Sequence, residues 1–269
     1  MGILLKKLDV PVVTVITRGA YFRQPLYNDL QKRKTSVHVD VSCMVTREEL
    51  KSLTVAELDA KLEAAFSFDN FRWQQENSVV IDEPFRADGL NRILYQCPHC
   101  GTEGKMEGKG IHLTCHQCGA KYELTETGFL KADNAAFTHV PDWYNWERQE
   151  VRKELEAGTY RLDVEVDIAM MVNYTALYMV GEGRRVHTTE GFHLTGCDGK
   201  LDYTQGPVAS HCLNADYFWY EIGDMISIGN QDVLYYCFPK NCGDVVAKTR
   251  LATEELYKMK KTRKPRNAE

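Results

Sequence analysis

The sequence contains no apolar run of the length that a membrane-spanning helix needs. A bilayer crossing takes about 20 consecutive apolar residues, whereas the longest run near the start, "VPVVTVI", has only the length of a strand. The first residues, "MGILLKKLDV", are too few and too charged for a signal peptide, and Lys6 breaks the myristoylation pattern. These absences predict a cytoplasmic location, with peripheral contact at the inner membrane face as the remaining membrane role.

The chain also lacks a general basic excess and the common short catalytic signatures. Its formal net charge of -5 gives no overall attraction to nucleic acid or acidic lipid. There is no GxSxG, no glycine-rich phosphate loop and no long repeat. One stretch near the end is basic, and it is either a solvated tail or a weak contact with anionic membrane or nucleic acid. Its cations are Lys258, Lys260, Lys261, Arg263, Lys264 and Arg266.

Several periodic segments are present in the first third of the chain. "DVPVVTVITRG" (9–19) predicts a buried, parallel strand, and the alternation in "TSVHVDVSCMV" (35–45) predicts a half-buried one. Thr46 with Glu49, and Thr54 with Glu57, have the spacing of helix-initiating capping boxes. At 269 residues, the chain is longer than one small core needs, so we expect two or three modules.

The second half changes from helical to strand periodicity. "HVPDWYNWERQEVRKELEAG" predicts a helix that ends at Gly158. A series of short strands follows, with "GEG", "EGF" and "CDGK" as hairpin turns, and "DVVAKTRLATEELYKMK" predicts a closing helix. This order favours a curved antiparallel sheet or small barrel capped by a helix, and it resembles pleckstrin-homology-like domains.

The clearest motif is a pair of CxxC turns. Cys97 and Cys100 form the first, and Cys115 and Cys118 form the second. Two such turns on adjacent hairpins bring four sulfurs to one point, which is the arrangement of a structural zinc ribbon. Gly101 and Gly119 follow the two turns and supply the left-handed backbone that they need. We therefore predict one structural Zn²⁺ held by these four cysteines.

Other uses of these cysteines are less consistent with the pattern. Two CxxC pairs in a ribbon favour metal over redox chemistry, and an iron–sulfur cluster would be unusual at this spacing. A catalytic zinc ion needs an open coordination position, and four thiolates leave none. His99, His112 and His116 could each replace a cysteine ligand, but we expect them to be exposed knuckle and strand residues.

The charge of the ribbon bears on nucleic-acid binding. Its cations are balanced by acids, and four thiolates around Zn²⁺ add further negative charge. A phosphate-binding surface needs a basic excess, so nucleic acid is not the expected partner and a folding or spacing role is favoured. The balancing groups are Lys105, Lys109, Lys121 and Lys131 against Glu103, Glu107, Glu123 and Glu126.

Two further residue pairs could in principle carry chemistry. His193 and Asp198 have His-x4-Asp spacing, which suits a general base acting on a hydroxyl. This pair straddles a strand end and a turn, so we assign it no catalytic role. His211 and Cys212 are adjacent in a strand-rich region, where neighbouring side chains point to opposite faces. The remaining cysteines, Cys43, Cys197, Cys237 and Cys242, lack paired spacing.

Several segments resemble a known enzyme family. "LLKKLDVPVVTVITRGAYFRQP" is similar to the last block of the catalytic domain in 1-acyl-sn-glycerol-3-phosphate acyltransferases. "AFSFDNFRWQQEN", "CPHCGTEGKMEGKG", "GFHLTGCDGKLDYTQ" and "DYFWYEIGDMISIGNQD" resemble the C-terminal extension of the Firmicutes-type enzymes. The extension resemblance covers most of the chain, and the catalytic-domain resemblance covers only about its first forty residues.

The resemblance implies acyl transfer to lysophosphatidic acid from acyl-CoA or acyl carrier protein. In that family an early His-x4-Asp deprotonates the acceptor hydroxyl, and a later block binds the phosphate. Neither motif precedes Val10 here, so we expect the chain to be a C-terminal part of such an enzyme and inactive alone. The alternative is a non-enzymatic module that binds a protein or lipid partner.

The expected fold class is α+β. The expected modules are the end of an acyltransferase-like α/β domain (1–45), a helical linker (46–92), a zinc ribbon (93–131), a helix (132–158), and an antiparallel β domain with a C-terminal helix and basic tail (159–269).

Overall fold

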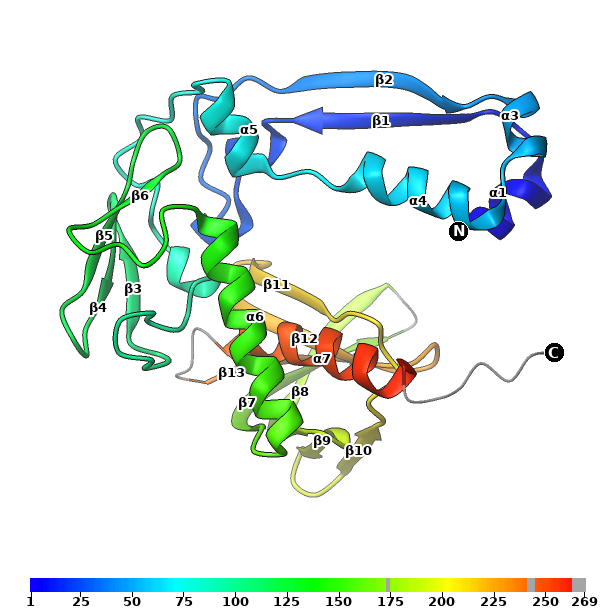
Figure 1. The fold of residues 1–269 in the computed structure, drawn as a ribbon. Helices are drawn as coiled ribbons and strands as arrows, with labels where there is room; N and C mark the ends of the chain where they lie inside the picture. The colour runs from blue at the N-terminus through cyan, green and yellow to red at the C-terminus, as the bar shows by residue number, and fades with distance from the viewer. Residues whose placement is uncertain (173–174, 241–244, 263–269) are drawn as a thin grey trace. The chain divides into compact units, whose positions relative to one another are not determined.

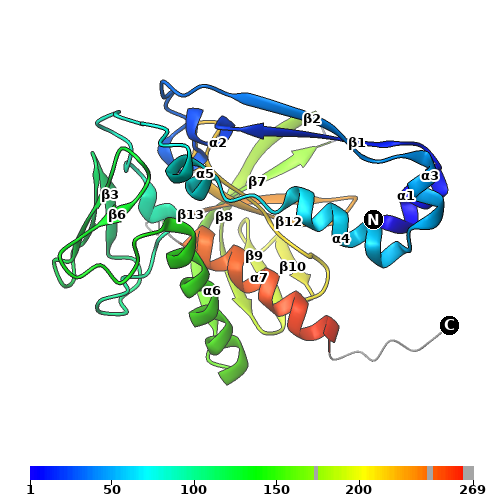
Figure 2. The ribbon, with the colours of Figure 1, turned by 45° about the horizontal axis from the view of Figure 1, so that its top comes forward.

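The structure is a computed structural model that describes residues 1–172, 175–240 and 245–262 (Figure 1 and, turned by 45°, Figure 2). It is a mixed α+β fold with antiparallel sheets and a C-terminal helix. The chain divides into two compact units. Unit 1 comprises Met1–Pro25, Gln31–Glu83 and Glu126–Gly128, and unit 2 comprises Leu26–Leu30, Pro84–Thr125 and Phe129–Glu269.

Unit 1 contains a two-stranded antiparallel sheet and five helices. Both predicted capping boxes are present, since Thr46 and Thr54 each accept a hydrogen bond from the backbone of the glutamate three residues later. The glutamate side chains accept the N–H groups of the two threonines in return, which fixes both helix starts. The elements are α1 (Gly2–Leu8), β1 (Val12–Arg18), α2 (Ala20–Arg23), β2 (His38–Val45), α3 (Arg47–Ser52), α4 (Val55–Phe66) and α5 (Asn70–Glu76).

The prediction of a buried, parallel strand over 9–19 is wrong. β1 pairs antiparallel with β2, and directly opposed residues include Val15 with Val41. Val13, Val15, Val39 and Val41, here called the valine face, are 57, 59, 54 and 66% exposed. The prediction of a half-buried strand over 35–45 is also wrong for most of β2, which is exposed except at its last two residues. Its alternation still groups Val39 and Val41 correctly, because they lie on one face together with Val13 and Val15. Sequence alternation identifies a face, but it does not show whether another layer covers that face.

The first part of unit 2 is a small four-stranded ribbon. Its strands follow each other in the order β3-β4-β5-β6, all antiparallel. These strands are β3 (Met106–Lys109), β4 (His112–Cys115), β5 (Lys121–Leu124) and β6 (Leu130–Lys131), and the short 3-10 turns η1 (Leu26–Asn28) and η2 (Leu90–Arg92) also belong to this unit. The predicted helix follows as α6 (Val140–Ala157), and Gly158 ends it in the left-handed conformation with φ 70°.

The second part of unit 2 is a seven-stranded antiparallel sheet followed by a helix. The strand order is β10-β9-β8-β7-β13-β12-β11, so β7, the first strand of the series along the chain, pairs with β13, the last. The elements are β7 (Arg161–Val172), β8 (Ala176–Thr188), β9 (Gly191–Gly196), β10 (Leu201–Gln205), β11 (Asn214–Trp219), β12 (Gly223–Gly229), β13 (Leu234–Pro239) and α7 (Val245–Thr262). This confirms an antiparallel β domain with a C-terminal helix.

The "GEG" segment is not a hairpin turn, contrary to the prediction. Gly181 and Gly183 both lie inside the continuous strand β8. A Cβ atom on Gly183 would come within 2.3 Å of the Thr195 carbonyl oxygen and 2.6 Å of Ile168 Cδ1. Glycine is therefore needed here for close packing between strands rather than for chain reversal. The other two predicted turns, at "EGF" and "CDGK", are present.

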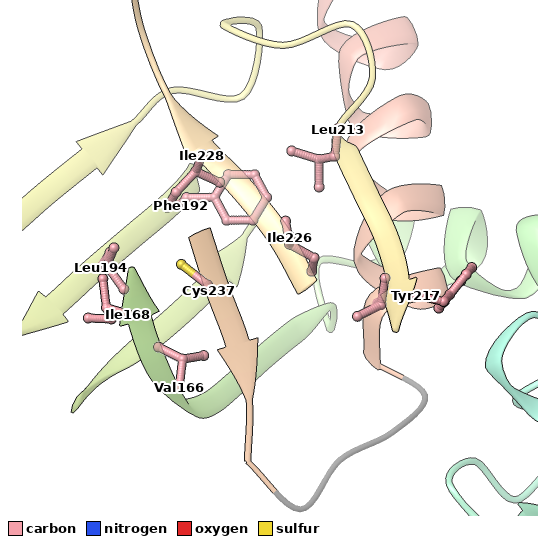
Figure 3. Packing of buried hydrophobic residues seen from close by; sticks show 10 residues of the cluster. Val166, Ile168, Phe192, Leu194, Leu213, Tyr217, Ile226, Ile228 and Cys237 are labelled. Carbon is pink, nitrogen blue, oxygen red and sulfur yellow. The ribbon is translucent and has the colours of Figure 1, made fainter. Parts of the chain in front are cut away.

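One face of the large sheet forms the main core. Figure 3 shows Val166 and Ile168 of β7 close to Phe192 and Leu194 of β9 and to Cys237 of β13. Val246 of α7 belongs to the same cluster, so this helix covers the same face of the sheet. A second cluster joins α6 to α7 through buried leucine, valine and alanine side chains. The two helices therefore form one packed layer within unit 2.

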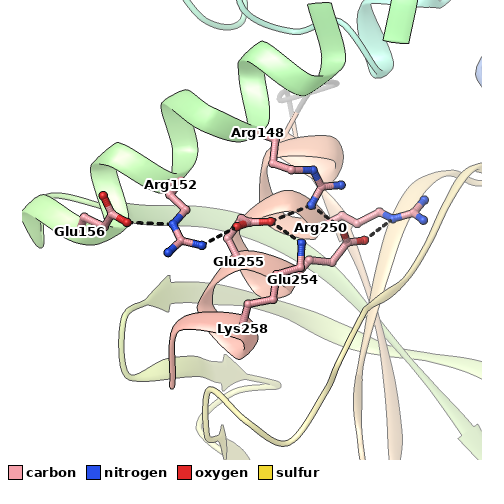
Figure 4. Close-up of polar contacts among 7 residues, drawn as sticks. All are labelled: Arg148, Arg152, Glu156, Arg250, Glu254, Glu255 and Lys258. Atoms are coloured by element: carbon pink, nitrogen blue, oxygen red, sulfur yellow. Dashed lines mark hydrogen bonds and ion pairs between the residues drawn. The ribbon is translucent and has the colours of Figure 1, made fainter. Parts of the chain in front are cut away.

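Ion pairs reinforce the packing of α6 on α7 (Figure 4). Arg148 of α6 binds Glu254 and Glu255 of α7 at 2.7 and 3.1 Å, and Arg152 also binds Glu255 at 3.1 Å. Glu255 is almost fully buried and has Lys258 as a further partner. Hydrogen bonds from these cations hold the pKa of Glu255 below its usual value, despite the opposing effect of burial.

Candidate metal centre

The two CxxC turns of the ribbon have the same backbone geometry. In the first, Gly101 N–H donates to the Cys97 carbonyl, and Cys97 N–H donates to Thr102. In the second, Gly119 N–H donates to the Cys115 carbonyl in the same way. Gly101 and Gly119 have φ values of 72° and 77°, a conformation that strongly favours glycine. The sequence thus specifies two matched knuckles, one before β3 and one between β4 and β5.

The knuckles bring four sulfur atoms together. The Sγ atoms of Cys97, Cys100, Cys115 and Cys118 all lie within 4.8 Å of one another. The Cys97–Cys118 and Cys100–Cys115 separations are 3.7 and 3.8 Å. A tetrahedral ion with metal–sulfur bonds of about 2.3 Å requires sulfur separations of about 3.8 Å. The donor set therefore fits one four-coordinate metal ion.

Local groups set the proton affinity of two of these thiols in opposite directions. The Thr102 hydroxyl and backbone N–H lower the pKa of Cys100 to about 6. Burial raises the pKa of Cys97 to about 12. Cys100 therefore ionises readily, whereas a metal ion must displace the proton of Cys97 when it binds.

The geometry also separates this site from the alternatives. A disulfide needs sulfurs about 2.05 Å apart, and every described cysteine is free. A multi-iron cluster places its thiolates on different iron atoms, which would hold the sulfurs further apart than one shared ion does. The three nearby histidines do not join the group of metal-binding atoms. His116 instead contacts Glu107 at 2.9 Å on the exposed surface.

The first knuckle is attached to α6 by buried polar contacts. Gln96, which precedes Cys97, donates its backbone N–H to Glu147 Oε1 at 2.8 Å. Its carbonyl accepts a hydrogen bond from Trp143 Nε1 at 3.0 Å. The Trp143 ring also meets Tyr122 of β5 edge-on, with ring centres 4.9 Å apart. These contacts are not predictable from the sequence, because no local pattern links residues about fifty positions apart.

The other candidate pairs from the sequence do not form catalytic arrangements. His193 Nε2 contacts Asp202 Oδ1 at 2.8 Å, in an exposed pair across neighbouring strands, rather than Asp198. His211 meets the Tyr257 ring edge-on, with ring centres 5.0 Å apart, and the adjacent Cys212 is exposed.

The remaining cysteines differ in exposure. Cys43 is exposed, Cys197 is half-buried and Cys237 is buried. Cys242 lies outside the described residues, as do Arg263, Lys264 and Arg266 of the predicted basic tail. The described lone cysteines therefore share no common environment that indicates a reactive site.

A polar cavity of about 590 Å³ opens elsewhere in unit 2, next to η2 and the start of β12. Arg92 lies between Asp29 and Asp224 and pairs with both. Asp88 accepts the Gly110 N–H, and Asp224 also accepts the Phe218 N–H. Burial raises the pKa of Asp224. In the described part of the chain, only the four cysteines group as metal-binding atoms. The charged side chains around this cavity pair with one another instead, so we do not assign a second metal site here.

His187 is a buried titratable residue that sequence analysis missed. Its ring stacks on Phe192 with centres 3.8 Å apart, and its Nδ1 lies 2.9 Å from the Tyr160 hydroxyl. Burial, with a smaller effect from Arg185, lowers the pKa of His187 from 6.5 to about 3. The folded chain therefore keeps this imidazole neutral at pH values where the unfolded chain protonates it.

This shift predicts acid sensitivity. Above pH 6.5 the imidazole of His187 is neutral in both the folded and the unfolded chain, and the folded chain keeps its full stability. As the pH falls from 6.5 toward 3, only the unfolded chain binds the proton, so the free energy of unfolding falls by up to about 1.4 kcal/mol per pH unit. Urea unfolding between pH 7 and 4 measures it. A His187→Gln chain should lose less stability over this range than the wild type. Parallel pH curves for wild type and His187→Gln would rule out the effect.

Comparisons with known proteins identify no relative. No family, no curated protein and no solved structure matches this chain. Within the described residues, none of the helices combines the length and apolar character that a bilayer crossing requires.

Proposed function

We propose that this chain is a metal-stabilised, non-catalytic module that presents its antiparallel β domain to a protein or lipid partner. The closed set of four cysteine sulfurs supports this proposal most directly. Four thiolates leave no coordination position for a substrate or a reactive water molecule. The ion, which we propose to be Zn²⁺, would therefore act by stabilising a ribbon too small to bury a large core.

The end of β11 and the turn that leads to β12 support a binding role for the β domain. Phe218, Tyr220 and Glu221 have positive φ values of 54°, 47° and 60°. Such conformations cost of order 1 kcal/mol or more in bulky residues, and they cluster at functional sites. Trp219 anchors the turn by stacking on Tyr236 with ring centres 4.6 Å apart. Tyr220 is left 78% exposed, where it can contact a partner.

The acyltransferase resemblance gives a second proposal, and the valine face of unit 1 favours it. An uncharged apolar sheet face is normally covered by another layer. In this proposal, the catalytic body of a glycerophospholipid acyltransferase covers the valine face. That body would supply the His-x4-Asp motif and the sites for lysophosphatidic acid and for acyl-CoA or acyl carrier protein. The eight described cysteines are free, which supports a cytoplasmic location.

Metal analysis and an acyl-transfer assay on the same purified chain test these proposals. We expect about one zinc ion per chain, as a single four-thiolate site requires. We also expect no transfer of acyl groups from acyl-CoA to lysophosphatidic acid. A chain without metal contradicts the ribbon proposal, and sustained turnover contradicts the non-catalytic role. The assay should be repeated with acyl carrier protein as donor, because the two donors differ in the surface they present.

A further inference from the structure

Lys248 of α7 is a buried cation that reaches the ribbon. It is only 7% exposed. Its Nζ atom lies 2.8 and 2.9 Å from the two carboxylate oxygens of Glu103. It also lies 2.8 Å from Glu154 Oε1 on α6. One ammonium group therefore joins three parts of unit 2: the ribbon, α6 and α7.

Glu103 occupies a particular place in the ribbon. It follows Cys100 by three residues, in the loop that closes the first knuckle. Thr102, next to it, donates its hydroxyl and its N–H to the Cys100 sulfur and its carbonyl accepts the Cys97 N–H. The backbone that positions the Glu103 carboxylate is therefore the same backbone that positions two metal-binding sulfurs.

A second contact joins the same knuckle to the same helical layer. Gln96, immediately before Cys97, is held by Glu147 and Trp143 of α6. Glu147 and Trp143 are both fully buried. The first knuckle thus touches the helical layer on both sides of its cysteine pair, at Gln96 and at Glu103.

We propose that Lys248 is a positioning residue for the metal site, and that it couples metal binding to the packing of α6 and α7. This inference rests on the proposed metal site. A buried ammonium group is stable only when it is paired, so Lys248 favours the loop shape in which Glu103 faces it. The metal ion favours that same loop shape through Cys97 and Cys100. Two effects that favour one conformation strengthen each other, and the coupling is reciprocal.

A Lys248→Met chain tests the coupling from the helix side. Methionine keeps much of the side-chain volume and removes the charge. The zinc dissociation constant, measured by competition with a chromogenic chelator, should rise about tenfold, which is about 1.4 kcal/mol. Lys240→Met is the matched control, because Lys240 also pairs with two carboxylates, Asp167 and Glu182, but does so within the β domain. Its zinc affinity should stay within about twofold of the wild type.

Glu103→Gln tests the same coupling from the ribbon side and does not place a new apolar group among buried charges. It should weaken zinc binding in the same direction as Lys248→Met. Circular dichroism on each zinc-loaded chain confirms that it is folded. If Lys248→Met does not fold, Glu103→Gln decides the question. Wild-type zinc affinity in a folded Glu103→Gln or Lys248→Met chain refutes the coupling.

Hydrogen exchange tests the reverse direction in the wild-type chain. Removing zinc with a chelator should speed amide exchange in α6 and α7, whereas the β9–β10 hairpin should change little. Equal exchange in α6 and α7 with and without zinc refutes the coupling. A wild-type chain that binds no zinc refutes the proposed metal site itself, so the two failures are distinguishable.

Discussion

A Cys97→Ser chain is expected to lose its metal ion and to unfold its ribbon. Cys97 is one of four sulfurs around a single point and is fully buried. Serine is a poor ligand for a soft-donor site, and three thiolates cannot close the tetrahedron. Metal binding contributes on the order of 10 kcal/mol or more to the folding of small zinc modules, which makes this the largest effect that we expect. Elemental analysis and thermal unfolding measure it.

Cys212→Ser is the matched control for this substitution. Cys212 is a lone, exposed cysteine of unit 2 that does not belong to the four-sulfur group. Its replacement should leave the metal content at about one ion per chain and the unfolding temperature close to that of the wild type. If Cys97→Ser keeps its metal and its unfolding temperature, the four-thiolate site is wrong. If both variants lose metal, the loss reflects general unfolding rather than a missing ligand.

The features that sequence analysis identified correctly are set by local chemistry. The capping boxes at Thr46 and Thr54 need only residues three positions apart. The end of α6 follows from Gly158 after its last residue. Each CxxC turn likewise carries its own two sulfurs and its own glycine. Such signals are readable because the interacting groups are neighbours in the chain.

The features that sequence analysis missed depend on distant residues. Lys248 lies 145 residues from Glu103, and nothing in the surrounding sequence distinguishes it from a surface lysine on a helix. The exposed valine face was predicted to be buried, because a strand pattern contains no information about the next layer. Gly183 was assigned to a turn, because a glycine needed for close packing of two strands resembles one needed for a turn. For Lys248 and Gly183, the deciding contact is made by another part of the chain.

The attachment of the ribbon to α6 determines how these two parts of unit 2 unfold. Trp143 connects the two by packing against Tyr122 and by donating to the Gln96 carbonyl. These contacts are tertiary, so they form only when both the knuckle and the helix are in place. The ribbon and the helical layer should therefore unfold together rather than as independent pieces. Loss of the Trp143 ring should disturb both of them.

A Trp143→Ala chain is expected to be less stable than the wild type by about 3–5 kcal/mol. Trp143 is 0% exposed, so its removal leaves a cavity and also an unpaired Gln96 carbonyl. Trp143→Phe keeps most of the ring and should cost about 1–3 kcal/mol, mainly for that carbonyl. Trp146→Ala, at a half-buried position one turn along α6, is the control and should cost less than Trp143→Ala. Urea unfolding of the zinc-loaded chains measures all three, and equal costs at the two tryptophans would mean that Trp143 does not join the ribbon to α6.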